Sequence, residues 1–350
     1  MEKEKVRAGR NQTLVLNDDD IARLEKKLLT GEQLASCFEK KFGKAAAGEK
    51  CRNESEPDNK SQENMSLEAS AEDFFVNRTI NGDLLKCIDF IPDEIFDLII
   101  IDPPYNLSKD FNGNIFKSMK DEEYQDYLES WFCLVVKKLK KNGSLYLCGD
   151  WKCTSALQRV MEKYLTVLNR ITWQREKGRG ARANWKNSME DIWFGVKDKD
   201  DYYFDVESVK MKRRVIAPYK SEGQPKDWEE SEDGNFRLTY PSNFWDDISV
   251  PFWSMPENTD HPTQKPEKLY AKLILASSRP GDLVFDPFLG SGTTSVVAKK
   301  LGRRWCGIEQ NKTYCLWAEK RLERAESDST IQGYRDGVFW ERNSLSSHRK

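Results

Sequence analysis

Hydrophobic and polar positions follow two different spacings along the middle of the chain. Short runs of mostly apolar residues, typical of buried strands, cover residues 96–101, 144–148, 167–173, 282–285 and 305–309. Apolar residues at helical spacing lie between and around these runs and predict helices over residues 121–140, 154–164, 266–276, 295–301 and 313–322. This order of strands and helices predicts an α/β fold built on a mostly parallel sheet.

The two ends of the chain lack this alternation. Residues 17–20 could cap a helix over residues 21–29, with Gly31 as its stop. Residues 48–73 are polar and predict a disordered linker. We therefore expect residues 1–73 to form an N-terminal arm, a solvated tail with one helix, with dimerisation or DNA contact as the alternative role. Residues 326–350 predict a loose polar tail.

Composition narrows the class of protein. The chain has 350 residues, of which 38% are hydrophobic and 33% charged, which favours a soluble protein with a sizeable core. We find no apolar run of transmembrane length and no signal-peptide pattern, so we expect a cytoplasmic protein without membrane contact. The eight cysteines form no Cys-x-x-Cys pair and only two histidines occur, which argues against a metal site. A net charge of −2 does not by itself indicate nucleic acid.

Two motifs follow predicted strands. Asp102-Pro103-Pro104-Tyr105 comes directly after the strand at residues 96–101, and its prolines force a stiff, extended turn. Ligands of open α/β sheets bind at the carboxyl ends of strands, so this turn is a candidate site of chemistry. The alternative is an ordinary loop stiffened by proline.

The second motif, residues 286–294, joins the strand at 282–285 to the helix at 295–301. Its Gly290-Ser291-Gly292 turn lets the backbone approach a nucleotide-like ligand closely, with helix amides facing it. The next strand ends in Glu309, where a carboxylate usually accepts hydrogen bonds from ribose hydroxyls. Together these elements predict a site for a nucleotide-like cofactor.

The motifs resemble those of the amino-methylating DNA methyltransferases, which use S-adenosyl-L-methionine (SAM). Asp102–Tyr105 resembles the catalytic motif, residues 288–292 the methionine-binding motif and residues 261–266 (His-Pro-Thr-Gln-Lys-Pro) a further cofactor motif. The catalytic motif precedes the methionine-binding motif, which is the order of the β group. The resemblance runs from about residue 74 to residue 322.

The resemblance implies a Rossmann-like sheet with helices on both faces. The methyltransferase domain would span residues 74–325, with a target-recognition insertion at about residues 174–258. The cofactor-binding residues that it implies are Asp83, Thr263, Lys265, Asp286, Phe288, Gly290, Ser291, Gly292, Thr293 and Glu309. For Asp83, an ordinary turn residue is an equally good interpretation.

The resemblance also assigns roles in catalysis. An exocyclic amino nitrogen is a poor nucleophile, because its lone pair is delocalised into the base. The Asp102 carboxylate and the Pro103 carbonyl would each accept one amino hydrogen, Pro104 would complete the turn, and Tyr105 would stack on a base flipped out of the duplex. Methyl transfer would then be direct and would depend on positioning and electrostatics. Residues 107–120 could form a mobile loop over this site.

Basic residues gather inside the expected insertion. One cluster comprises Arg175, Lys177, Arg179, Arg182 and Lys186, and a second comprises Lys210, Lys212, Arg213 and Arg214. Basic residues mixed with glycine and aromatic residues suit contact with phosphates and bases. We therefore expect double-stranded DNA as the partner of these clusters, although charge runs commonly form solvated faces.

The expected activity is methylation of adenine N6, because Asp rather than Ser precedes Pro-Pro-Tyr. N4-cytosine methylation and a non-catalytic DNA-binding subunit are the alternatives. The absence of a Pro-Cys pair excludes C5-cytosine methylation. The motif order argues against RNA and protein-glutamine methyltransferases, and the lack of a third glycine argues against a dinucleotide oxidoreductase. Similar enzymes are often dimers and often accompany a restriction endonuclease, which leaves both as candidate partners.

Overall fold

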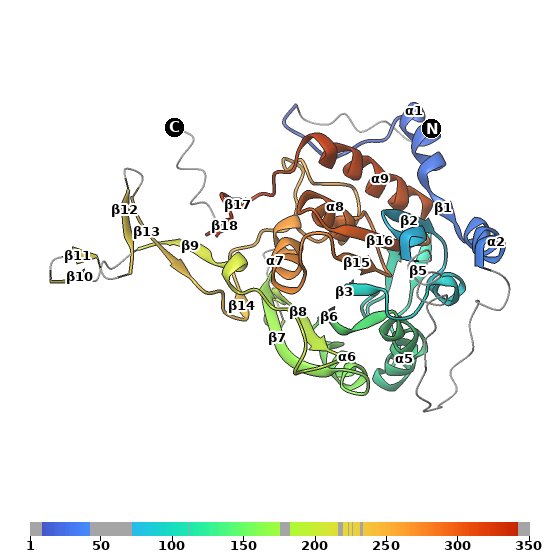
Figure 1. The fold of residues 1–350 in the computed structure, drawn as a ribbon, viewed down its shortest axis with the longest axis horizontal. Helices are drawn as coiled ribbons and strands as arrows, with labels where there is room; N and C mark the ends of the chain where they lie inside the picture. The colour runs from blue at the N-terminus through green and yellow to red at the C-terminus, as the bar shows by residue number, and fades with distance from the viewer. Residues whose placement is uncertain are drawn as a thin grey trace, which may run out of the picture.

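A nine-stranded sheet forms the centre of the protein (Figure 1). The computed structural model describes residues 9–42, 72–111, 113–175, 183–215, 220–222, 224–225, 227–231 and 234–341. In spatial order the strands are β1 (Leu29–Thr30), β2 (Arg78–Asn81), β16 (Arg304–Glu309), β15 (Leu283–Asp286), β3 (Phe96–Ile101), β6 (Leu139–Asp150), β8 (Met189–Val196), β7 (Thr166–Gln174) and β14 (Phe244–Trp245). Neighbours are parallel except where β8 pairs with β6 and with β7. The predicted mostly parallel sheet is confirmed.

Helices cover both faces of this sheet because successive side chains of a buried strand point to opposite sides. In β3, Ile99 and Ile101 belong to one core cluster, and Leu98 and Ile100 belong to the other. The first cluster is completed by α4 (Leu84–Cys87), η3 (Ile88–Phe90), α5 (Asp121–Lys137) and α6 (Thr154–Met161). The second is completed by α7 (Glu267–Ser277), α8 (Thr293–Lys300) and α9 (Lys312–Ser327). The predicted fold class is therefore confirmed.

The N-terminal segment packs against the domain, so the expectation of a solvated tail is wrong for residues 9–42. Asn17 caps α1 (Asp18–Leu24) through a capping box, and η1 (Glu25–Lys27) follows. Gly31 does not stop this helix but begins α2 (Gly31–Phe42). Between them β1 pairs with β2 at the edge of the sheet. The cause is apolar burial, since Leu14, Leu24, Leu34 and Phe38 are almost fully buried. Residues 48–71 of the predicted linker lie outside the described residues.

A smaller sheet projects from the main body (Figure 1). Its strand order is β12 (Glu229–Ser231), β13 (Gly234–Thr239), β9 (Met211–Arg214), β18 (Val338–Trp340) and β17 (Tyr334–Arg335). The hairpin β10 (Lys220–Ser221) and β11 (Gln224–Pro225) lies beside it, and η4 (Glu207–Val209) leads into it. The expected insertion at 174–258 is thus interrupted, because β8 and β14 belong to the main sheet.

The C-terminal segment up to residue 340 is docked rather than loose, which corrects the expectation for this part of residues 326–350. β18 pairs with β9, and the side chains of Phe339 and Trp340 are buried. The ammonium of Lys268 on α7 also donates to the Trp340 carbonyl at 2.6 Å. Burial of these two aromatic side chains holds the segment against the domain, although its polar composition predicted a loose tail. Residues 342–350 lie outside the described residues.

Candidate active site

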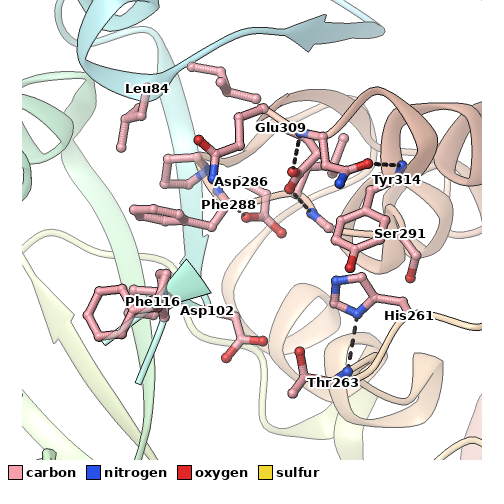
Figure 2. A pocket seen from close by; sticks show the side chains of 18 of the residues that line it. Leu84, Asp102, Phe116, His261, Thr263, Asp286, Phe288, Ser291, Glu309 and Tyr314 are labelled. Carbon is pink, nitrogen blue, oxygen red and sulfur yellow. Dashed lines mark hydrogen bonds between the residues drawn. The ribbon is translucent and has the colours of Figure 1, made fainter. Parts of the chain in front are cut away.

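A cavity of about 580 Å³ opens where the parallel strands β2, β3, β15 and β16 end. Gly82, Asp102, Asp286 and Glu309, which stand at or directly after these strand ends, all line it. Figure 2 shows Asp286 between Asp102 and Glu309, with His261 and Tyr314 along one side. The sequence therefore brings its two motifs to one continuous cavity, as the common direction of the strands requires.

The glycine-rich turn leaves room in this cavity through its backbone. Gly290 has a φ of +54°, and a Cβ on it would lie 3.1 Å from Nε2 of His261. The Gly290 N–H donates to the Glu309 carboxylate at 2.9 Å (Figure 2). Gly292 has a φ of +83° but is not among the residues that line the cavity. A Cβ there would lie 2.8 Å from Cα of Ala318, so Gly292 allows α8 to approach α9.

Two partly or fully buried carboxyl groups frame the turn. Asp286 accepts hydrogen bonds from the Phe288 N–H and the Thr294 hydroxyl, and burial raises its pKa to about 7. Glu309 accepts from the Asn311 N–H at 2.7 Å as well as from Gly290, and burial raises its pKa too. Asp286, Glu309 and Ser291 all line the cavity. These acceptor groups fit the ammonium and ribose hydroxyls of SAM.

His261 forms a neutral wall of the cavity. Its ring lies 4.4 Å from the ring of Tyr314 in an edge-to-face contact, and its Nδ1 accepts from the Thr263 N–H at 3.3 Å (Figure 2). Burial, and after it the charge of the neighbouring Lys265, lowers the pKa of His261 to about 3, so the imidazole is uncharged. Thr293 lines the cavity and donates to the Lys265 carbonyl at 3.0 Å.

At the other end of the cavity, Asp102 is held by two donors. The Tyr105 hydroxyl lies 2.9 Å from Oδ1, and the Lys265 ammonium lies 2.6 Å from Oδ2. Burial lowers the pKa of Lys265, but the carboxylates of Asp102 and Glu190 outweigh this effect and raise it overall. Lys265, expected at the cofactor, thus contacts the catalytic motif. Pro103 lines the cavity, and the Pro104 carbonyl accepts from the Tyr124 hydroxyl at 2.9 Å.

The segment expected as a mobile loop contains a hairpin, β4 (Lys109–Phe111) and β5 (Asn114–Phe116). Ile115 and Phe116 of this hairpin line the cavity, and the Phe116 ring packs 5.3 Å from the ring of Tyr127. The same aromatic cluster continues from Tyr127 to Trp131, and Phe288 packs against Trp131 with ring centroids 4.9 Å apart. Asp83 also lines the cavity while it caps α4 through the Lys86 N–H, so both of its interpretations fit.

The predicted DNA-contacting residues fall in three places. Lys177, Arg179 and Arg182 lie outside the described residues. Lys186 is exposed, and Arg175 lines the cavity, where it pairs with Glu190 at 2.5 Å. Arg213 and Arg214 lie on β9 in the smaller sheet, where Arg214 is exposed and Arg213 is half-buried. The structure therefore places Arg175 at the active site and Arg213 and Arg214 on the projecting sheet.

Sequence reasoning missed several residues of the site. Trp131, Phe116 and Tyr314 were predicted only as parts of helices or a loop. Glu190 had a usable signal, because it and Asp191 are two acids at the start of a strand whose other residues are apolar or glycine. Glu190 is only 4% exposed. Among the described residues, no group of three or more His, Cys, Asp or Glu side chains could hold a metal ion. In the same part of the chain, no helix is both long and apolar enough to cross a membrane.

Known proteins are similar to this chain in sequence. A family model described as DNA methylase, of the N6/N4 methyltransferases, matches residues 96–320. The DNA adenine methyltransferase YhdJ of Escherichia coli is 34% identical over 279 residues, which cover 76% of this chain and 91% of that protein. The type II methyltransferase M.HpaI of Haemophilus parainfluenzae is 32% identical, covering 73% and 76% of the two chains.

A solved structure supports the fold. The PvuII DNA methyltransferase (cytosine-N4-specific) aligns with a TM-score of 0.52 at 19% identity, covering 72% of this chain and 92% of that one. The family match spans both motifs and the strands that carry them. The chain therefore belongs to the N6/N4 amino-methylating DNA methyltransferases, a family of SAM-dependent enzymes.

Proposed function

We propose that this protein methylates N6 of adenine in double-stranded DNA. The observation that carries the proposal is the single cavity that joins the Asp102 carboxylate to the glycine-rich turn. A methyl donor held at the turn and an amino group held at Asp102 would share one enclosed space. Adenine is favoured by Asp at the head of the catalytic motif and by the name of the E. coli relative.

The cofactor end would be formed by Gly290, Ser291, Asp286, Phe288 and Glu309, with Asp83, Thr263 and Thr293 at its margins. When bound, SAM supplies an electrophilic methyl group on a positively charged sulfur. Glu309, fixed by two backbone N–H groups, would accept hydrogen bonds from ribose hydroxyls. The aromatic pair of Phe288 and Trp131 would shield this end from water.

At the acceptor end, Asp102 would orient the amino group of a base flipped out of the duplex. Its carboxylate and the Pro103 carbonyl would each accept an amino hydrogen, which concentrates the lone pair on nitrogen. SAM, when bound, would supply a methyl group to this lone pair, and the proton that the amino nitrogen loses would pass to water. Tyr105 would contact the face of the base.

The test is incubation with labelled SAM and unmethylated DNA, followed by nucleoside digestion and mass spectrometry. N6-methyladenine is the expected product, and N4-methylcytosine would contradict the choice of base. Asp102→Asn is expected to lower the rate by about 100-fold or more while SAM still binds. Asp150→Asn is the matched control, because Asp150 ends the neighbouring strand β6 and does not line the cavity.

A role beside a restriction endonuclease is supported by the relatives named type II methyltransferases, M.HpaI and M.HinfI. The modified DNA would then resist cleavage at the methylated site. Expression of the protein in a host without DNA methylation, followed by digestion of the host DNA with a panel of endonucleases, tests this role. DNA that is methylated yet cut by every enzyme whose site overlaps the methylated sequence would contradict it.

A further inference from the structure

Glu190 is a buried acid beside the catalytic motif to which the proposed reaction gives no role. It lies on β8, a central strand held between β6 and β7, and is 4% exposed. Three donors surround its carboxylate: Arg175 at 2.5 Å, the Tyr105 hydroxyl at 3.2 Å and the Lys265 ammonium at 3.3 Å. It also lines a second cavity of about 230 Å³ that shares Arg175, Thr263 and Lys265 with the main cavity.

Two of these donors also contact Asp102. The Tyr105 hydroxyl lies 2.9 Å from Asp102 and 3.2 Å from Glu190, and the Lys265 ammonium lies 2.6 Å from Asp102 and 3.3 Å from Glu190. Both donors are thus placed between two carboxylates and are nearer to Asp102. A phenol hydroxyl has one proton, so Tyr105 can donate to only one of them at a time.

This arrangement obstructs the proposed chemistry. Each oxygen of Asp102 already faces one donor, which weakens the acceptor that remains for an incoming amino hydrogen. The Lys265 ammonium also weakens Asp102 as an acceptor and opposes the positive charge that develops on the amino nitrogen. A second acceptor for both donors removes the obstruction, and Glu190 is already within reach of each.

We propose that Glu190 is a positioning residue of methyl transfer, to which Tyr105 and Lys265 move their hydrogen bonds when the substrate amino group binds Asp102. The inference rests on the proposed function of Asp102. Arg175 holds the Glu190 carboxylate in place, since it pairs with Oε1 while the Tyr105 hydroxyl faces Oε2. Two acids and two bases make the group neutral overall, so the exchange moves no net charge into the site.

The first experiment compares Glu190→Gln with Asp191→Asn in single-turnover methylation of unmethylated DNA. Glu190→Gln keeps the shape but not the charge, and the rate is expected to fall about 30-fold, as for the loss of a charged hydrogen bond. The affinity for SAM, measured by calorimetry, and the KM for DNA are expected to stay within about threefold of the wild type. Asp191 is the matched control, because it is buried on the same strand but bonds to Thr172 instead.

A double variant separates positioning from simple structural support. In Tyr105→Phe, one of the two donors is gone, so the Glu190→Gln defect is expected to be smaller in this background than in the wild type. A structural role for Glu190 predicts equal defects in both backgrounds, and that result would overturn the proposal. If Glu190→Gln does not fold, Glu190→Asp takes its place in both comparisons. The shorter aspartate side chain keeps the charge but moves the carboxylate away from Tyr105 and Lys265.

The outcomes also separate this inference from the proposed function. A wild-type rate in Glu190→Gln together with an inactive Asp102→Asn overturns the role of Glu190 alone. Full activity in Asp102→Asn overturns the proposed function of Asp102 and the role of Glu190 with it. A loss of SAM affinity in Glu190→Gln equal to its loss of rate assigns Glu190 to cofactor binding and likewise overturns the proposal.

Discussion

The ammonium of Lys265 lies 2.6 Å from Oδ2 of Asp102, although 163 residues separate them in the chain. Lys265 is 6% exposed, so Lys265→Met leaves the half-buried carboxylate of Asp102 and the buried carboxylate of Glu190 without this cation. We expect the free energy of unfolding to fall by about 3–5 kcal/mol at neutral pH, as measured by urea denaturation. Asp102→Asn in the same chain removes the unpaired charge and is expected to recover part of this loss. Strictly additive effects of the two changes would contradict a pairing that matters for stability.

Gly290→Ala tests the space that the glycine-rich turn leaves for the cofactor. The new Cβ meets His261 and requires a left-handed backbone, so the affinity for SAM is expected to fall about tenfold or more in calorimetry. Gly302→Ala is the matched control, because Gly302 also has a positive φ (+74°) but nothing lies within 4 Å of its Cβ position. Equal affinities in the two variants would show that the contact with His261 is unimportant for binding.

Asp286 is expected to make stability depend on pH. Burial raises its pKa from 3.8 to about 7, so between these values the folded protein binds one more proton than the unfolded chain. Stability from this group is therefore greatest at low pH and is lost as the pH rises towards about 7. Asp286→Asn removes this dependence. Relative to the wild type, its free energy of unfolding is expected to rise by up to about 4 kcal/mol between about pH 4 and pH 8.

The measurement for Asp286 is urea denaturation across this pH range without SAM. Asp198→Asn, which removes an exposed carboxylate after β8, serves as the control for general charge effects. A constant difference between Asp286→Asn and the wild type at all pH values would contradict the burial argument.

The N-terminal segment is expected to support cofactor binding through Tyr314. Leu14 packs on Tyr314 and Trp317, and Tyr314 lines the cavity beside His261. Leu14→Ala is expected to cost about 2–5 kcal/mol of stability and also to weaken SAM binding. Leu24→Ala, which opens a similar void against Cys315 and Leu316, is expected to lose stability only. The same SAM affinity in both variants would show that the N-terminal segment does not support cofactor binding.

The smaller sheet is expected to contact DNA phosphates through Arg214. Arg214→Gln removes one exposed cation on β9, so the slope of log affinity against log salt is expected to shrink by about 0.9 on duplex DNA. Lys163→Gln is the control, because Lys163 joins the segment after α6 to Glu129 on α5, on the main body. An unchanged slope in Arg214→Gln would leave this arginine as part of a solvated face.

The strands that carry the motifs could be predicted from the sequence. Runs such as residues 96–101 are mostly apolar on both faces and are followed by chemically distinctive residues. The sequence also indicated that Asp102, Asp286 and Glu309 lie near one another, because the carboxyl ends of parallel strands lie at one edge of the sheet. Contacts between residues that are distant in the chain could not be predicted from the sequence. The docking of Leu14 and Phe339 depends on surfaces that form only when the sheet is assembled. The contact of Lys265 with Asp102 was likewise invisible, because the motif that contains Lys265 pointed to the cofactor.

The order of strands in the main sheet has a consequence for synthesis of the protein on the ribosome. β2, near residue 80, pairs on its inner side with β16, which ends at Glu309, and β1 pairs with β2. Until β16 has emerged from the ribosome, β1 and β2 have no strand to join them to the rest of the sheet. The cavity also lacks Glu309 at this stage. Translation that stops before residue 309 therefore yields a product without a complete cofactor site. The cavity is therefore complete only once β16 has left the ribosome and has paired with β2.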